Sequence, residues 1–247
     1  MSTIPTDGMQ RTVVVTGVTS GIGEALAARL AGRFRVLGIG RSEERLAAGA
    51  RRHGFVPITC DLARPDERQQ AIAEIVGHCE GRGGRLAALV NNAAECVYQT
   101  PTGLDEGAWH HLMQVNLLAA VHLVAGLAAR LQGGRLVNVS SVVTRHLPAA
   151  RFGPYAVSKA ALEEWTRAVR LELAPHDVGV TLVAPGLVDT PIYGKVAGAE
   201  ALQARMREQV PVWLGAADVA EAVAWILEQP ARVVVAELVL LPRGQAR

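Results

Sequence analysis

The sequence predicts one α/β domain, in which a doubly wound, seven-stranded parallel sheet carries helices on both faces. The first observation behind this is the alternation of short apolar, β-branched runs with longer helical patterns along almost the whole chain. The second is that these runs are apolar throughout, as in parallel strands covered on both sides. The third is the length of 247 residues, which suffices for one large core, with no repeat or linker dividing the chain.

The expected strands are Thr12–Val15, Arg35–Ile39, Phe55–Thr59, Leu86–Val90, Arg135–Val139, Val180–Val183 and Val233–Leu241. The expected helices are Ile22–Ala31, Glu43–Arg52, Asp66–Cys79, Glu106–Leu131, Tyr155–Leu173 and Ala217–Glu228. In the first helix, Ile22, Leu26 and Leu30 recur at helical spacing, which places them on one buried face. Pro175 and Pro230 follow the last two helices and are suited to end them.

Composition excludes several classes of protein. Half of the residues are apolar and 19% are charged, which excludes a disordered chain. The net charge is +2 and the basic residues are scattered along the chain, so the sequence does not favour nucleic-acid binding. Cys60, Cys79 and Cys96 have no paired spacing, which indicates reduced thiols, no metal site and a cytoplasmic protein. Residues 1–10 lack the apolar core of a signal peptide and are expected to be a flexible tail before one domain over 11–247. No apolar run is expected to reach the about 18 residues of a membrane span.

A glycine-rich turn joins the first expected strand to the first expected helix. Its sequence is Thr16-Gly17-Val18-Thr19-Ser20-Gly21-Ile22-Gly23. Gly17 allows a tight turn, and the later glycines let a pyrophosphate approach a helix N-terminus, where free N–H groups and the helix dipole favour anions. The spacing G-x-x-x-G-x-G differs from the general fingerprint, so an ordinary turn is the alternative. In its strand–helix context the turn predicts a Rossmann-like dinucleotide site, with contacts from Gly17, Thr19, Ser20, Gly21, Ile22 and Gly23.

Three further strand ends are expected to complete the nucleotide site. The second expected strand is followed by Arg41-Ser42 and by no carboxylate, which favours the 2′-phosphate of NADP(H) over the free ribose of NAD(H). The alternative is a solvated arginine beside Ser42 as helix N-cap. Asp61-Leu62 is expected beside the adenine, although Asp61 also suits a helix entry. Asn92 and Ala93, in Asn91-Asn92-Ala93-Ala94, are expected close to the nucleotide, where the amides mainly tie strand ends together.

A second constellation indicates proton transfer. Tyr155 and Lys159 are spaced i, i+4, so they share one helix face. A phenol with a pKa near 10 is a poor acid at neutral pH, and a neighbouring ammonium is expected to lower that pKa. Ser141 lies 14 residues earlier, at the end of an expected strand, and can hydrogen-bond the same substrate oxygen. A Tyr-x-x-x-Lys pair alone is often accidental, but its order after the glycine turn and the asparagines weakens that reading.

Together these residues resemble the short-chain dehydrogenase/reductase family. The matching motifs are TGVTSGIG at 16–23, NNAA at 91–94, VNL around Asn116, NVSS at 138–141, YAVSK at 155–159 and PGLVDT at 185–190. The resemblance implies a catalytic tetrad of Asn116, Ser141, Tyr155 and Lys159. It makes Tyr155 the general acid/base, has Lys159 bind the nicotinamide ribose and lower the tyrosine pKa, and has Asn116 hold a water of the proton relay. It also implies nicotinamide contacts from Pro185, Gly186, Val188 and Thr190.

The chain departs from the family pattern at Ala94, where a glycine is usual, and at Ser20, where NADP-preferring relatives often carry a basic residue. Ser20 leaves the 2′-phosphate mainly to Arg41. The resemblance further implies a homodimer or homotetramer formed through the two long central helices. The expected contacts are Leu117, Val121, Val124, Ala160, Ala161 and Trp165, and the alternative is that all of these belong to the core.

Residues 190–213 are long for a connection and are expected to be a substrate lid. Their expected apolar side is Tyr193, Val196, Leu202, Met206, Val210 and Trp213, opposite Lys195, Arg205 and Arg207. The facing loop, Val142–Pro154, adds Leu147 and Phe152, together with Arg145, His146 and Arg151. A lid of this kind favours a mainly apolar carbonyl compound, whereas those cations either pair with a substrate anion or solvate the loop.

The sequence therefore predicts an NADP(H)-dependent oxidoreductase that interconverts a ketone or aldehyde with its alcohol. One alternative is a nucleotide-binding regulator of the same fold without turnover, which the complete tetrad disfavours. Others are an NAD(H)-using dehydrogenase and an epimerase or dehydratase, the last disfavoured by the lack of a separate substrate domain.

Overall fold

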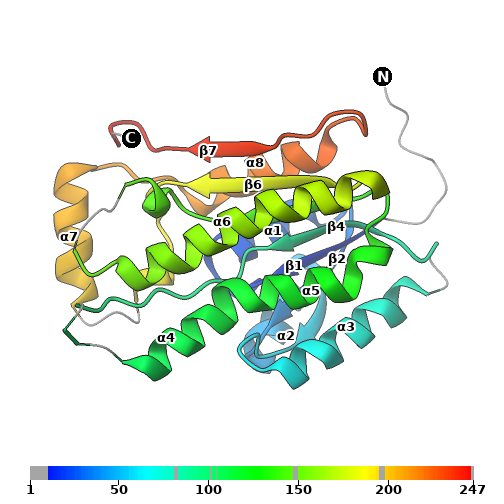
Figure 1. Cartoon of the computed structure of the whole chain (residues 1–247), viewed down its shortest axis with the longest axis horizontal. Helices are drawn as coiled ribbons and strands as arrows, with labels where there is room; N and C mark the ends of the chain where they lie inside the picture. Colours follow the sequence, from blue (N-terminus) through cyan, green and yellow to red (C-terminus); the bar gives the residue numbers. More distant parts are fainter. Residues whose placement is uncertain are drawn as a thin grey trace.

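The computed structural model describes residues 11–80, 83–100, 102–103, 105–146, 150–194 and 198–245, so the expected tail at 1–10 lies outside the described residues. The described residues form one seven-stranded parallel sheet in the order β3-β2-β1-β4-β5-β6-β7 (Figure 1). The strands are β1 Thr12–Thr16, β2 Arg35–Gly40, β3 Val56–Thr59, β4 Leu86–Asn91, β5 Arg135–Val139, β6 Gly179–Pro185 and β7 Glu237–Leu240. The chain order reverses between β1 and β4, which opens a crevice at the carboxyl ends of the central strands.

Helices cover both faces of the sheet. They are α1 Gly21–Leu30, α2 Glu43–His53, α3 Pro65–Cys79, α4 Glu106–Met113, α5 Ala119–Leu127, α6 Gly153–Leu173, α7 Ala199–Gln209 and α8 Ala216–Glu228. Alternate side chains of a strand point to opposite faces, so Val13 packs in a core layer with Leu26 of α1 and Val223 of α8. Val14 packs in the opposite layer with Leu123 of α5. Each of these buried side chains contributes about 1.5–3 kcal/mol through burial.

The expected helix Glu106–Leu131 is interrupted. A π-helical turn, Gln114–Leu118, separates α4 from α5, and a 3₁₀ turn, Ala128–Arg130, ends the stretch. The buried Arg68 stabilises the π turn, because its guanidinium donates to the Gln114 backbone oxygen at 3.2 Å and to Gln114 Oε1 at 2.9 Å. The interruption matters for the site because Asn116 lies inside the π turn.

The same stretch corrects a second expectation. By length and composition alone, Glu106–Arg130 meets the test for a membrane-spanning helix, which no part of the sequence was expected to meet. A core helix passes the same test, and 44% of the most apolar window is buried within the fold, where α5 contributes Leu123 and Leu127 to the core.

Two more expectations need correction near the C-terminus. The strand expected at Val233–Leu241 is only Glu237–Leu240, because β7 is an edge strand that pairs with β6 over four residues. The connection at 190–213, for which no helix was expected, contains α7. Leu202 and Met206 are spaced i, i+4 in a segment of strong helix formers, and both are buried.

Candidate functional site

The glycine turn lies between β1 and α1 at the carboxyl edge of the sheet. Gly17 and Gly21 have φ angles of +77° and +54°, which side-chain-bearing residues rarely adopt. A Cβ on Gly23 would lie 2.0 Å from the Gly17 oxygen, so only glycine fits there. Ser20 is the N-cap residue, but its side chain makes no capping hydrogen bond. The first N–H groups of α1 are therefore available for a ligand.

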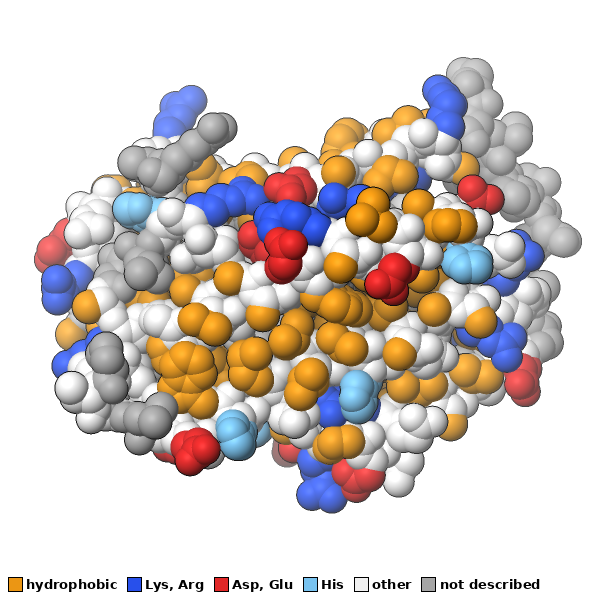
Figure 2. All heavy atoms as spheres, in the orientation of Figure 1, with side chains coloured by type: hydrophobic (Ala, Val, Ile, Leu, Met, Phe, Trp, Pro, Cys, Tyr) orange, Lys and Arg blue, Asp and Glu red, His pale blue; other side chains and the backbone are white. Residues whose placement is uncertain are grey.

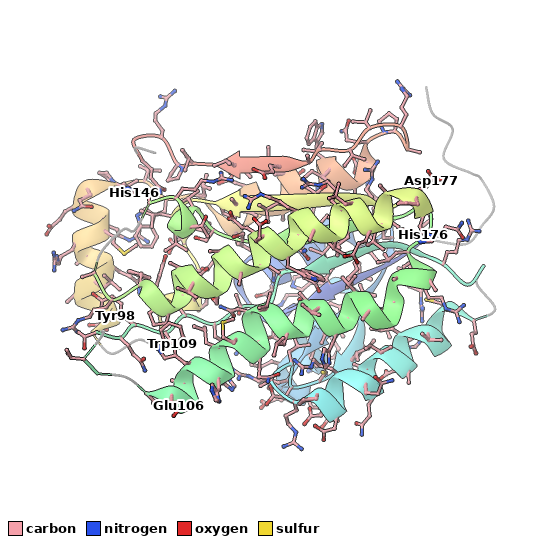
Figure 3. The ribbon with its side chains drawn as sticks, in the orientation of Figure 1. Tyr98, Glu106, Trp109, His146, His176 and Asp177 are labelled. Atoms are coloured by element: carbon pink, nitrogen blue, oxygen red, sulfur yellow. The ribbon has the colours of Figure 1, made fainter. Side chains whose placement is uncertain are left out.

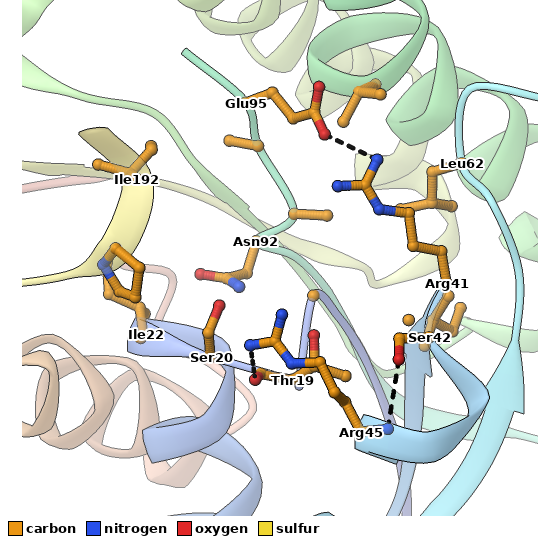
Figure 4. Close-up of a pocket in the computed structure, with 18 of the residues that line it drawn as sticks. Thr19, Ser20, Ile22, Arg41, Ser42, Arg45, Leu62, Asn92, Glu95 and Ile192 are labelled. Carbon is orange, nitrogen blue, oxygen red and sulfur yellow. Dashed lines mark hydrogen bonds and ion pairs between the residues drawn. The ribbon is translucent and has the colours of Figure 1, made fainter. Parts of the chain in front are cut away.

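A cavity of about 400 Å³ adjoins this turn (Figure 4). Most of the expected cofactor-binding residues line it: Gly17, Thr19, Ser20, Gly21, Ile22, Arg41, Ser42, Asp61, Leu62, Asn92, Ala93 and Thr190. The wall also includes residues that were not expected: Ile39, Gly40, Arg45, Cys60, Ala94, Glu95, Cys96, Val115, Pro191 and Ile192. Gly23, Tyr155, Lys159, Pro185, Gly186 and Val188 were expected to bind cofactor but do not line this cavity.

Several of the wall residues also hold strand ends together. Thr16 Oγ1 accepts from the backbone N–H groups of Asn92 and Ala93, each at 2.9 Å, and Asn92 Nδ2 donates to the Thr16 oxygen. Asp61 Oδ1 accepts from the Ala63 N–H at 3.0 Å, which makes the turn before α3. Asn92 therefore ties strand ends together, as the sequence favoured, and Asp61 forms a helix entry, which the sequence left open. Both residues also line the cavity.

Two arginines reach into the cavity from the segment after β2. Arg41 Nη1 lies 2.9 Å from Glu95 Oε1, and Arg45 Nη2 donates to the Thr19 oxygen at 2.9 Å. Ser42 caps α2, because its Oγ accepts from the Arg45 N–H at 3.3 Å. Sequence reasoning missed Arg45, although a second cation only four residues after Arg41, in the first turn of α2, was an available signal.

The reaction centre lies deeper, where α6 passes the end of β5. Lys159 Nζ donates to the Val139 oxygen at 2.8 Å and lies 5.9 Å from the centre of the Tyr155 ring. Both side chains are buried, with exposed fractions of 6% for Tyr155 and 1% for Lys159. Ser141 follows β5, and its Oγ accepts from the Val143 N–H at 3.2 Å. The structure thus brings the partly exposed Ser141 together with the buried Tyr155 and Lys159.

Burial controls the protonation of this group. Burial raises the pKa of Tyr155 above its usual range, Tyr193 and Cys96 add to the rise, and a hydrogen bond with Ser141 opposes it. Burial also lowers the pKa of Lys159 to about 8, although Glu163 and Cys96 act in the opposite direction. The net shift of the Tyr155 pKa is upward, because desolvation penalises the phenolate, and the expectation that Lys159 lowers this pKa stays a prediction. Tyr155 is a protonated acid at neutral pH.

Asn116 connects the two parts of the site. Its Oδ1 accepts from the Glu95 N–H at 2.8 Å, and its Nδ2 donates to the Glu95 oxygen at 2.9 Å and to Ser158 Oγ at 3.0 Å. Ser158 lies on α6 between Tyr155 and Lys159. Asn116 therefore links the wall of the nucleotide cavity to the helix that carries the acid.

The segment after β6 crosses from the reaction centre to the glycine turn. Pro185 ends β6, the Gly186 N–H donates to the Leu240 oxygen at 2.7 Å, and Val188 forms a bridge with Leu214. Thr190 lies against the glycine turn, since a Cβ on Gly21 would be 3.1 Å from its methyl carbon.

A row of four aromatic rings closes the reaction centre. Tyr98, Phe152, Tyr193 and Trp213 follow one another with ring-centre distances of 5.3, 6.1 and 6.3 Å. Phe152, Tyr193 and Trp213 share a buried cluster with Tyr155, and α7 contributes Leu202 and Met206, with Val210 just beyond its end. Figure 3 shows Tyr98 and His146 at the end of the molecule where α7 lies. Leu147, Lys195 and Val196 lie outside the described residues.

Cations stand at both ends of the aromatic row. The Arg207 guanidinium lies 4.3 Å from the centre of the Trp213 ring and pairs with Asp189 at 2.9 Å. The Arg151 guanidinium lies 5.6 Å from the centre of the Tyr98 ring, and Arg151 has a left-handed φ of 73°. Arg145 pairs with Glu237 at 3.1 Å, while Arg205 and His146 are exposed.

Comparisons with known proteins agree with this geometry. A family model described as short chain dehydrogenase matches residues 11–201. The chain is 32% identical over 206 residues to human dehydrogenase/reductase SDR family member 2, mitochondrial, covering 80% of this chain and 72% of that protein. It is 29% identical to serine 3-dehydrogenase of Agrobacterium fabrum, covering 96% of each chain. A short chain dehydrogenase from Burkholderia cenocepacia J2315, solved in complex with NADP, superposes with a TM-score of 0.83 at 30% identity, covering 96% of this chain and 98% of that chain.

Proposed function

Because the chain belongs to the short-chain dehydrogenase family, we propose that it is an NADP(H)-dependent oxidoreductase that interconverts a ketone or aldehyde with its alcohol. The observation that carries the proposal is the buried pair of Tyr155 and Lys159, with Ser141 next to them, beside a glycine-lined cavity. A non-catalytic regulator of the same fold would have no need of this acid in a water-excluded position.

The residues present suit a dinucleotide, because the turn between β1 and α1 carries glycines whose backbone N–H groups a pyrophosphate can approach. Gly23 packs so closely on the Gly17 oxygen that no Cβ fits there. Phosphates would lie at the N-terminus of α1, and the ribose 2′-phosphate between Arg41, Ser42 and Arg45. Lys159 would bind the nicotinamide ribose, and Val188 and Thr190 would bind the nicotinamide carboxamide. When bound, the cofactor supplies or accepts the hydride. The similar solved structure that holds NADP supports NADP(H) over NAD(H).

Tyr155 is suited to protonate the substrate oxygen during reduction, because burial keeps its phenol protonated. Ser141 can donate a hydrogen bond to the same oxygen and orient it. The phenolate that remains is stabilised by the ammonium of Lys159. With a pKa of about 8, Lys159 can exchange a proton near neutral pH and so return one to the tyrosine.

The aromatic row supports a substrate with an apolar body of moderate size. Within the described residues Arg145 and Arg207 have carboxylate partners, whereas Arg151 has none. A substrate that carries an acidic group at its far end would therefore pair with Arg151, and the similar Agrobacterium protein is named for serine, which bears a carboxylate. Paired compounds with and without a carboxylate test this. Arg151→Gln should raise KM only for the acidic member of each pair.

The assay that tests the function follows NADPH oxidation with a panel of ketones and aldehydes, with Tyr155→Phe as the blank. Turnover that the blank lacks supports the proposal, and NADPH binding without turnover of any carbonyl would favour the regulator. Arg41→Asp should raise the KM for NADPH about ten- to hundredfold and spare NADH, since one charge-assisted contact is worth about 1.5–3 kcal/mol. Equal use of NADH and NADPH by the unmutated protein would contradict the cofactor assignment.

We also propose a homo-oligomer built on the face of α4, α5 and α6. Figure 2 shows apolar side chains spread across this face. Leu117, Val121 and Trp165 are partly exposed there, and Ala160 is exposed. Val124, in contrast, is 4% exposed and belongs to the core. Val121→Asp should reduce the mass measured by light scattering, whereas Val212→Asp, at an exposed position beyond α7, should not.

A further inference from the structure

The carboxylate of Glu95 lies inside the nucleotide cavity and bridges two elements. Its Oε1 is 2.9 Å from Arg41 Nη1, and its Oε2 is 2.8 Å from His111 Nε2. Figure 4 shows the Arg41 and Glu95 side chains reaching toward each other from opposite walls of the cavity. Arg41 follows β2 and Glu95 follows β4, so their ion pair spans the crevice past the end of β1, which lies between these two strands.

The backbone of Glu95 is held in place. Its backbone N–H and oxygen both bond to the side chain of Asn116, at 2.8 and 2.9 Å. Asn116 is 2% exposed and is itself held to Ser158 of α6. The negative charge is thus attached to a rigid part of the fold, and its side chain is only 22% exposed.

We propose that Glu95 is a cofactor-specificity residue that competes with the 2′-phosphate of NADP(H) for Arg41. The inference rests on the proposed function, in which Arg41 receives that phosphate. A phosphate oxygen and the Glu95 carboxylate need the same guanidinium, so the Arg41–Glu95 pair must loosen when the phosphate binds. The carboxylate then remains on His111, close to a ligand that carries up to two negative charges.

Arg45 makes this competition productive. Its guanidinium lines the same cavity and donates one hydrogen bond to the Thr19 oxygen, at 2.9 Å. Because a guanidinium has five N–H donors, others can bind the phosphate. The wall of the cavity thus holds two arginines and two carboxylates, of which Glu95 pairs with Arg41 and Asp61 accepts from the Ala63 N–H. The two arginines attract the phosphate, and the charge of Glu95 weakens that attraction. NADH has no 2′-phosphate and does not meet this repulsion. Glu95 therefore reduces the difference in binding affinity between NADPH and NADH.

Calorimetric titration of Glu95→Gln with NADPH, NADH and adenosine 2′,5′-bisphosphate measures the effect without turnover. Glutamine keeps the size of the side chain and removes its charge. We expect about tenfold tighter binding of NADPH and of the bisphosphate, which equals about 1.4 kcal/mol. The gain is modest because Arg41 is 47% exposed and water screens the pair. NADH affinity should stay within about twofold.

Two comparisons separate competition from a general charge effect. Glu43→Gln removes the same charge from an exposed position in the first turn of α2, two residues from Arg41, and should change NADPH affinity less than about twofold. In an Arg41→Gln background, the gain from Glu95→Gln should fall at least about threefold, because the contested guanidinium is absent.

Unchanged or weaker NADPH binding by Glu95→Gln overturns the inference, as does equal tightening of NADPH and NADH. In those cases the wild-type protein still binds NADPH and the proposed function stands. Failure of the wild-type protein to bind NADPH at all overturns both.

Discussion

The adenosine half and the reaction half of the site lie on the same edge of one sheet but are built in opposite ways. The adenosine half is an open cavity lined by both polar and apolar residues, and its arginines are exposed. The reaction half is closed, and Tyr155 and Lys159 lie under a row of aromatic rings. Burial there shifts the pKa of the tyrosine up and that of the lysine down, so both favour their neutral forms. One half is suited to holding a charged ligand, and the other to moving a proton away from water.

Loss of the acid should have the largest effect. Tyr155→Phe keeps the ring and its packing but removes the proton, so turnover should fall about 10²–10⁴-fold while NADPH affinity stays near that of the wild type. Tyr193→Phe is the matched control, because it removes a second buried phenol from the same cluster. More than a tenth of wild-type kcat in Tyr155→Phe would assign the proton to another group.

Filling the glycine turn should impair the other half. A methyl group on Gly23 requires the backbone to move, so Gly23→Ala should destabilise the fold by about 1–3 kcal/mol. It should also weaken NADPH binding by more than about tenfold. Gly77→Ala in α3, where a Cβ meets nothing within 4 Å, serves as control. Full NADPH affinity in Gly23→Ala would show that phosphates do not bind at this turn.

Burial of the Lys159 ammonium should lower the stability of the fold at neutral pH. In the unfolded chain its pKa is near the ordinary 10.5 and in the fold about 8, so the unfolded state binds more protons between these values. Wild-type stability should therefore rise with pH across that interval, and below it the protein carries the full penalty of a buried charge. Lys159→Met should stabilise the protein at neutral pH by up to about 3 kcal/mol, at 1.36 kcal/mol per pKa unit.

Urea unfolding of both proteins across this pH range measures the difference. The stability gain of Lys159→Met should shrink as pH rises from about 8 to 10.5. A difference that is constant with pH would mean that the ammonium is not desolvated in the fold.

The smallest effect should come from the lid. Tyr193 and Met206 belong to the cluster over Tyr155, so Tyr193→Ala with Met206→Ala should raise the substrate KM and leave NADPH affinity within about threefold. Steady-state kinetics and calorimetry provide the two readings. A double variant with unchanged KM for every carbonyl, or with lost NADPH binding, would contradict the lid assignment.

Sequence reasoning succeeded where chemistry is local. The glycine turn and the residues after β2, β3 and β4 each sit beside a strand end, so parallel-strand topology alone brings them to one edge. The same short-range patterns predict the seven strands, and the observed seven-stranded parallel sheet confirms them.

What sequence missed depends on packing between distant segments. The Arg41–Glu95 pair joins residues 54 positions apart, and nothing local marks Glu95 as a partner. The π turn at Gln114–Leu118 is stabilised by Arg68 from another helix. The upward direction of the Tyr155 pKa shift is set mainly by burial, which a Tyr-x-x-x-Lys spacing does not reveal.

The most direct test of the central claim follows the hydride itself. The wild-type protein, given NADPH deuterated at the transferable position of its nicotinamide ring and a carbonyl substrate from the panel, should yield an alcohol that carries one deuterium by mass spectrometry. Tyr155→Phe should bind the same cofactor and yield almost none. An unlabelled alcohol, or label that appears equally with Tyr155→Phe, would contradict the assignment of this chain as an oxidoreductase with Tyr155 as its acid.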